Sequence, residues 1–313
     1  MVLIVWHHTD HPNILNYTFY NETLFFVSGM LFKPCGWSLF VKKRIQRFLV
    51  PFFFFYIVYY LFLIFLNYLK YHAVSSDIYL SIFDVFRWYK DYDAYTCNYP
   101  LWFIWALFWV QVQTNFLVSL LKKYEFLFII SLTISILGYM YIQHIPTPLI
   151  TGRSTSFLVY YVAGYLSSQY LIQKMQYKYV LMASVVTWSL LLFIISFCPL
   201  STFIKTLFHI FIYIAFSIIL LQLCKNVQPV SLKKTLAFFG VNSIVLFGMH
   251  DMYLTILRIF TFNTIGRMDV ALGCANWMAT LLLMTPTIYF INRYLPFLIG
   301  RERRKLDENY HTL

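Results

Sequence analysis

The chain has 313 residues, of which 60% are hydrophobic and 21% aromatic, and it carries 24 Lys and Arg against 12 Asp and Glu. Its apolar residues come in blocks close to the roughly 20 residues that a helix needs to cross a bilayer, which excludes an ordinary soluble core. Because basic residues gather on the cytoplasmic side of membrane proteins, the net charge of +12 indicates membrane orientation and not nucleic-acid binding. We predict an all-α, polytopic membrane bundle over residues 1–300, followed by a basic cytoplasmic tail at 301–313.

About ten candidate spans follow one another along the chain. The first is too short to cross a bilayer, because Met1–Trp6 offers only about two turns before the polar stretch His7–Asp10. Placing the loop Lys33–Arg47 in the cytoplasm brings most of the basic residues to that side, so both termini are expected there, in the plasma (bacterial inner) membrane. The spans are 1–9, 20–33, 47–69, 100–121, 125–143, 155–173, 178–198, 201–222, 235–260 and 270–299.

Two histidines, His7 and His8, end the first apolar stretch. An imidazole at the end of a span can simply lie in the membrane interface. It can also act as a general base, because it titrates near neutral pH and can take a proton from an attacking hydroxyl.

The densest charge cluster is the block Lys42–Arg47, just before Pro51 and an aromatic span. One interpretation is a cytoplasmic anchor that contacts membrane lipid phosphates. However, Arg44 and Arg47 are three residues apart and would share one face of an α-helix. Two guanidiniums there can bind a phosphate or pyrophosphate bidentately, which suits an anionic donor such as a coenzyme A thioester.

Several polar or aromatic residues lie in or beside later spans. Trp102 opens the fourth span and fits an interfacial aromatic belt, whereas Arg153 is either a snorkelling cation or a functional one. Asn242, Ser243 and His250 lie within one predicted span and should face the bundle interior. The His, Cys and acidic residues show no ligand spacing, so no metal site is predicted.

Five short motifs follow one another along the chain. They are Val5-Trp6-His7-His8-Thr9, Phe25–Phe32, Lys43–Phe48 with Pro51 and Tyr56, Leu101-Trp102-Phe103-Ile104, and Asn242-Ser243 with His250. In this order they resemble the acyltransferase-3 family of integral membrane acyltransferases, and the resemblance covers about residues 2–299. That family includes enzymes that O-acetylate sugars of surface polysaccharides, lipopolysaccharide, exopolysaccharide and peptidoglycan.

The resemblance implies transfer of an acyl group, acetyl being the expected one, from acyl-CoA to a hydroxyl of a cell-surface or lipid-linked glycan. Acetyl-CoA would be a substrate, and no permanently bound cofactor is implied. His8 would be the catalytic residue because Thr9 follows it, with His7 in the preceding small-residue position. Arg44 and Arg47 would contact the donor or support its site.

The resemblance also implies roles for residues in the second motif and in the two later ones. Ser28 and Gly29 would permit close helix approach near the donor site, and Trp102 and His250 would belong to the same family pattern.

Two alternatives remain. A transporter of polysaccharide units or lipid-linked sugars also uses aromatic helices and a basic cytoplasmic edge, although it does not need the ordered motifs. An inactive, truncated relative is the other, because the family has a basic residue about three helical turns before the catalytic His, a position that would fall before Met1.

Overall fold

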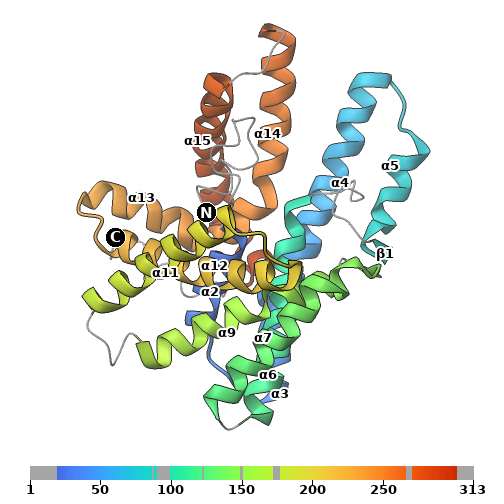
Figure 1. Cartoon of the computed structure of the whole chain (residues 1–313). Coiled ribbons are helices and arrows are strands. Elements are labelled where there is room, and N and C mark those ends of the chain that lie inside the picture. Colours follow the sequence, from blue (N-terminus) through green and yellow to red (C-terminus); the bar gives the residue numbers. More distant parts are fainter. Residues whose placement is uncertain are drawn as a thin grey trace.

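The computed structural model describes residues 20–86, 88–89, 99–121, 123–148, 151–171, 177–265 and 270–301. These residues fold almost wholly into helices, which confirms the predicted all-α class (Figure 1). His7, His8, the predicted span 1–9 and residues 302–313 of the tail lie outside the described residues.

Within those ranges, six helical segments are long and apolar enough to cross a membrane, which is the architecture of an integral membrane protein. The total of about ten spans stays a prediction. The six segments are Trp37–Tyr71, Trp102–Leu120, Lys178–Phe197, Thr202–Lys225, Ser243–Asn263 and Ala271–Tyr294.

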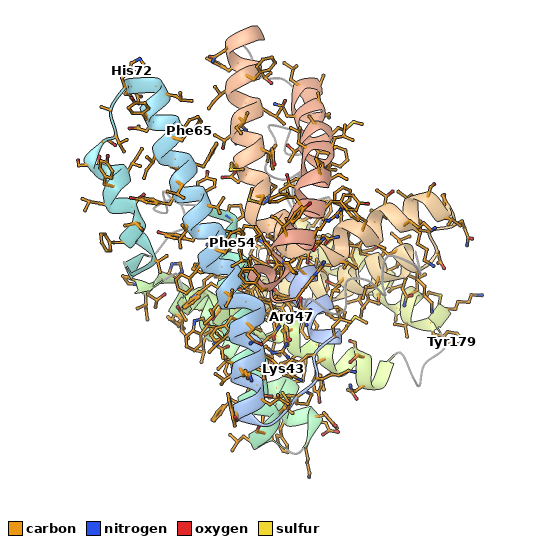
Figure 2. All side chains as sticks on the ribbon, turned by 180° about the vertical axis from the view of Figure 1, so that it is seen from behind. Lys43, Arg47, Phe54, Phe65, His72 and Tyr179 are labelled. Carbon is orange, nitrogen blue, oxygen red and sulfur yellow. The ribbon has the colours of Figure 1, made fainter. Side chains whose placement is uncertain are left out.

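The longest segment begins earlier than the span predicted at 47–69. It joins α3 (Trp37–Arg44), the π-helical turn η2 (Ile45–Leu49) and α4 (Val50–Tyr71), and Figure 2 shows its side chains from Lys43 past Arg47 and Phe65 to His72. A proline inside a helix loses one backbone hydrogen bond and its ring clashes with the carbonyl four residues earlier. The wider π-helical turn directly before Pro51 accommodates that clash, so the helix continues.

The two ends of this long helix lie at opposite ends of the molecule. We call the end that carries α3 the α3 end; α5 lies beside the other end of α4 (Figure 1). Tyr56 of α4 donates a hydrogen bond to the Ser81 carbonyl at 2.7 Å, which ties the connection after α4 back onto the helix. That connection contains α5 (Ser76–Leu80), η3 (Ser81–Phe86) and the short strand β1 (Trp88–Tyr89), which pairs antiparallel with β2 (Thr147–Pro148).

The middle of the chain supplies the most buried helix, α9 (Leu158–Leu166), whose residues 158–165 are all buried. It packs against α2 (Tyr20–Met30) from the start of the described chain. The other elements of this part are η5 (Tyr99–Leu101), α6 (Trp102–Leu120), α7 (Tyr124–Met140), η6 (Ile142–His144), α8 (Thr151–Ser154), η7 (Thr155–Phe157) and η8 (Ser167–Leu171).

The single span predicted at 235–260 is wrong, because the helix breaks at Asn242. The side-chain amide of Asn242 donates to the Phe238 carbonyl at 2.8 Å, which satisfies a helix-end carbonyl and terminates α13. The C-terminal elements are α11 (Tyr177–Phe197), α12 (Thr202–Lys225), α13 (Val230–Val241), α14 (Ser243–Ile265), α15 (Val270–Tyr294) and η9 (Pro296–Ile299).

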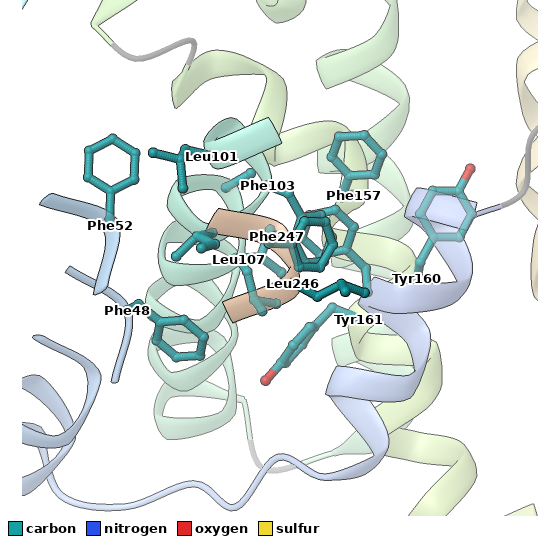
Figure 3. Close-up of a cluster of buried hydrophobic side chains, with 14 of the residues drawn as sticks. Phe48, Phe52, Leu101, Phe103, Leu107, Phe157, Tyr160, Tyr161, Leu246 and Phe247 are labelled. Carbon is teal, nitrogen blue, oxygen red and sulfur yellow. The ribbon is translucent and has the colours of Figure 1, made fainter. Parts of the chain in front are cut away.

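Two glycines bring α2 and α9 into backbone contact. A Cβ on Gly29 would lie 1.9 Å from the Tyr161 carbonyl oxygen, and one on Gly164 would lie 1.9 Å from that of Phe26. Such close approach is what small residues permit between membrane helices. Around this crossing, aromatic rings fill the core, including the stacked pair Phe103 and Phe247 with centroids 4.7 Å apart (Figure 3).

Candidate functional site

Arg44 lies at the C-terminal end of α3, beside two neighbouring aromatic rings. Its guanidinium carbon is 5.2 Å from the Phe40 ring centroid and 5.7 Å from that of Phe32, within range of cation–π attraction. The residue is half-buried, so the rings take part of the place of water around the cation. The guanidinium is therefore held in a defined position at the α3 end.

Arg47 follows in the π-helical turn and is exposed. The prediction of one shared face assumed α-helical spacing, whereas Arg47 stands in the wider turn of η2 and is more exposed than Arg44. The charges of the two guanidiniums still lie within electrostatic reach of each other. The backbone of Arg47 is in turn packed against Gly300, whose φ is +70° and where a Cβ would lie 2.8 Å from the Arg47 Cα. Arg44 is thus half-buried against two rings, and Arg47 is exposed.

The loop between α2 and α3 is held by a residue that the sequence did not single out. Asn115 of α6 is fully buried, accepts a hydrogen bond from the Cys35 backbone N–H at 3.3 Å and donates one to the Cys35 carbonyl at 3.3 Å. These two bonds fix where α3 starts and therefore where Arg44 lies. The available signal was a run of amide side chains, Gln111, Gln113 and Asn115, inside the apolar span 100–121.

Tyr161 of α9 is a second residue that sequence reasoning missed. Its ring packs edge-on against Phe32 with centroids 5.5 Å apart, so Phe32 contacts both Tyr161 and Arg44. The charges of Arg44 and Arg47 both lie within electrostatic reach of the Tyr161 hydroxyl. Nothing in the sequence distinguishes it among 26 tyrosines. We refer to Arg44, Arg47, Phe32, Phe40 and Tyr161 as the arginine cluster.

Arg153 lies elsewhere. It is on α8, and its charge acts on the carboxyl group of Glu22 in the first turn of α2. At 1.5 Å per residue, Glu22 lies roughly 12 Å along α2 from its last residue, Met30, and Phe32 comes two residues after that end. Arg153 is therefore not brought together with the arginine cluster.

Trp102 begins α6 and packs into the core from there. Its ring centroid lies 6.0 Å from that of Phe103 and 5.7 Å from that of Phe157. Of the small residues in the Ser-Gly motif, Gly29 forms the close contact with α9, and Ser28 is half-buried beside it.

Asn242 belongs to a buried amide network with two residues that the sequence analysis did not select. Asn292 donates to the Asn242 carbonyl oxygen at 2.8 Å. Arg301 donates to Asn292 through one guanidinium nitrogen and to the Val241 carbonyl through another, at 2.7 Å. This amide network ties the α13–α14 break to α15 and to the segment that packs on Arg47.

The rest of the last motif lies on α14. Ser243 is its first residue. His250 is fully buried, with Nδ1 2.7 Å from the Leu246 carbonyl oxygen, and the adjacent Asp251 accepts a hydrogen bond from the Tyr59 hydroxyl at 2.7 Å. These contacts join α14 to its own preceding turn and to α4.

Across the described ranges, no three His, Cys, Asp or Glu side chains gather in a way that could hold a metal ion. What the α3 end offers instead is two guanidiniums, a phenol and aromatic rings, a set suited to an anionic ligand with a less polar arm.

The helical fold and the basic, aromatic site define this chain as an integral membrane protein with a site for an anionic ligand. A comparison with protein families identifies the family. A family model described as an acyltransferase domain matches residues 1–292. The chain therefore belongs to the acyltransferase-3 family. No curated protein and no solved structure matches it.

Proposed function

We propose that this membrane acyltransferase is an O-acyltransferase that moves an acyl group, acetyl in the first instance, from acyl-CoA to a hydroxyl of a cell-surface or lipid-linked glycan. The observation that carries the donor half of this proposal is the arginine cluster, where Arg44 is half-buried against two rings and Arg47 is exposed three residues on. Coenzyme A combines phosphates, which guanidiniums bind well, with an uncharged arm.

The α3 end is placed in the cytoplasm in this proposal, where acyl-CoA is available, and the protein in the bacterial inner membrane. The positive-inside distribution of Lys and Arg supports that orientation. Lys42 and Lys43 are exposed on the same helix end and add to the attraction for an anionic donor or for lipid phosphates.

His8 is the proposed general base. Its imidazole takes the proton of the acceptor hydroxyl as the hydroxyl oxygen attacks the thioester carbonyl. The C–O ester bond forms, the C–S bond breaks, and the coenzyme A thiolate leaves and receives a proton. The reaction is balanced with acyl-CoA and an alcohol as the only reactants.

The test uses a deletion strain complemented with wild-type protein, His8→Ala or His144→Ala, an exposed histidine of η6 that serves as the matched control. Mass spectrometry of the surface glycan should show the acyl mass with wild type and His144→Ala. A general base contributes roughly 10²–10⁴-fold, so His8→Ala should abolish the signal while the protein stays folded in the membrane.

Two results would overturn the proposal. Full acylation with His8→Ala would show that His8 is not the general base. Accumulated precursor and missing polymer in the deletion strain, in place of intact polymer lacking only the acyl mass, would support a transporter of lipid-linked sugars.

A further inference from the structure

Two neighbouring tyrosines on α9 are equally buried, but their hydroxyl groups differ in hydrogen bonding. Tyr160 and Tyr161 are both fully buried, and Figure 3 shows their hydroxyls pointing in opposite directions. The Tyr160 hydroxyl lies 3.2 Å from that of Tyr139, with which it shares a hydrogen bond. The Tyr161 hydroxyl has no hydrogen-bond partner in the part of the chain that the structure describes.

The Tyr161 hydroxyl is not alone in this. The Nε–H of Arg44 is also buried and, again within the described ranges, has no hydrogen-bond partner. Both side chains contact the ring of Phe32, Tyr161 at 5.5 Å and Arg44 at 5.7 Å between centres. Two buried donors from different helices therefore lie near the same aromatic ring.

The backbone of Tyr161 has little freedom to move its hydroxyl toward another partner. Its carbonyl rests directly on Gly29 at the crossing of α2 and α9, and its ring is held by Phe32. Buried polar groups in native proteins are nearly always hydrogen-bonded, so an exception calls for a specific explanation. A phenylalanine would pack as well at this position without the unmet group, which indicates that the hydroxyl serves a ligand.

We propose that the Tyr161 hydroxyl, together with the Nε–H of Arg44, hydrogen-bonds the acyl-pantetheine arm of acyl-CoA. This inference rests on the proposed function and deepens it. Burying a phosphate is costly, so the phosphates stay at the exposed Arg47, and the arm with its amide and thioester carbonyls extends inward. A phenol is a neutral donor suited to such carbonyls.

The experiment compares Tyr161→Phe with Tyr160→Phe, a matched control one residue away. Purified proteins in lipid nanodiscs are titrated with acetyl-CoA and, separately, with adenosine 3′,5′-bisphosphate, which lacks the pantetheine arm. One lost hydrogen bond to a neutral group corresponds to about three- to ten-fold in affinity. Tyr161→Phe should lower the affinity for acetyl-CoA by that factor and leave the affinity for the bisphosphate unchanged. Tyr160→Phe should leave both affinities within about two-fold of those of the wild type.

Arg47→Gln provides the opposite pattern, because the loss of a phosphate contact should weaken both probes. Circular dichroism and size-exclusion chromatography establish that each variant is folded, and Tyr161→Phe keeps the ring that packs on Phe32.

Equal affinity of wild type and Tyr161→Phe for acetyl-CoA would overturn this inference alone. Equal weakening of both probes by Tyr161→Phe would also overturn it, because the hydroxyl would then act at the nucleotide end. If the wild-type protein binds neither probe, the proposed function itself fails.

Discussion

The arginine cluster and the amide network have similar polar side chains and opposite hydrogen-bonding states. In the amide network, Asn242, Asn292 and Arg301 satisfy one another and two backbone carbonyls. In the arginine cluster, Arg44 and Tyr161 each keep a buried atom that no described residue satisfies. The first arrangement holds helices together through its own hydrogen bonds, whereas in our proposal the acyl donor supplies the hydrogen bonds that the second lacks.

The largest effect is expected at Gly29, which positions Tyr161 without contributing a polar atom. Gly29→Ala places a methyl group 1.9 Å from a backbone oxygen, and neither helix backbone can yield cheaply. Overpacking of this kind costs about 1–3 kcal/mol or more, so thermal unfolding in detergent should occur at clearly lower temperature. Gly36→Ala, where a Cβ meets nothing within 4 Å, is the control. Equal stability of the two variants would contradict the close crossing.

The next largest effect is expected in the amide network, where a substitution should lower the free energy of unfolding. Asn292→Ala leaves Asn242 and Arg301 without their common partner in a buried region, at a cost of about 2 kcal/mol. Chemical denaturation monitored by tryptophan fluorescence measures this. Asn67→Ala, which removes only an exposed bond to the Ser75 N–H, should cost much less. If both variants unfold alike, the network is not structural.

Arg44→Lys sharpens the comparison, because it keeps the charge and removes the planar guanidinium. We expect about a ten-fold rise in apparent KM for acetyl-CoA with little change in unfolding temperature. Arg47→Lys should have a smaller effect that shrinks further with added salt, since the exposed residue acts mainly through its charge. If Arg44→Lys lowers stability and leaves the KM for acetyl-CoA unchanged, Arg44 has a structural role like that of the amide network and does not bind the donor.

The smallest effect is expected at Asn115, which acts on the cluster through the loop before α3. Its two bonds to Cys35 are long, at 3.3 Å, so Asn115→Ala should cost about 1 kcal/mol of stability and raise the KM for acetyl-CoA a few-fold. Thr133→Ala, which removes an exposed hydroxyl bonded within α7, is the control for unfolding and for kinetics. An unchanged KM would show that the loop does not set the position of Arg44.

Much of the fold could be predicted from the sequence, because a membrane-spanning helix is recognised by its long run of apolar residues. The break at Asn242 could not, since α13 and α14 are both apolar and the decisive event is one side-chain amide bonding to Phe238. The early start of the long helix was also missed, because its first turns carry exposed lysines that resemble a loop.

The candidate site was predicted only in part. The spacing of Arg44 and Arg47 is visible in the sequence, but the π-helical turn that contains Arg47 and precedes Pro51 is not. Tyr161 could not be selected, because its importance comes from a contact with Phe32, which is far away in the chain. The candidate His8 lies outside the described residues and stays a prediction.

The claim that the arginine cluster holds the acyl donor is tested most directly by photo-crosslinking. The wild-type protein would be irradiated with an acyl-CoA that carries a diazirine on its acyl chain, with excess acetyl-CoA as competitor, and the labelled peptides mapped by mass spectrometry. We expect competable labelling on residues 31–49 and 158–166, which surround Arg44 and Tyr161. Competable labelling confined to the far ends of α14 and α15, with none on those two segments, would contradict the account.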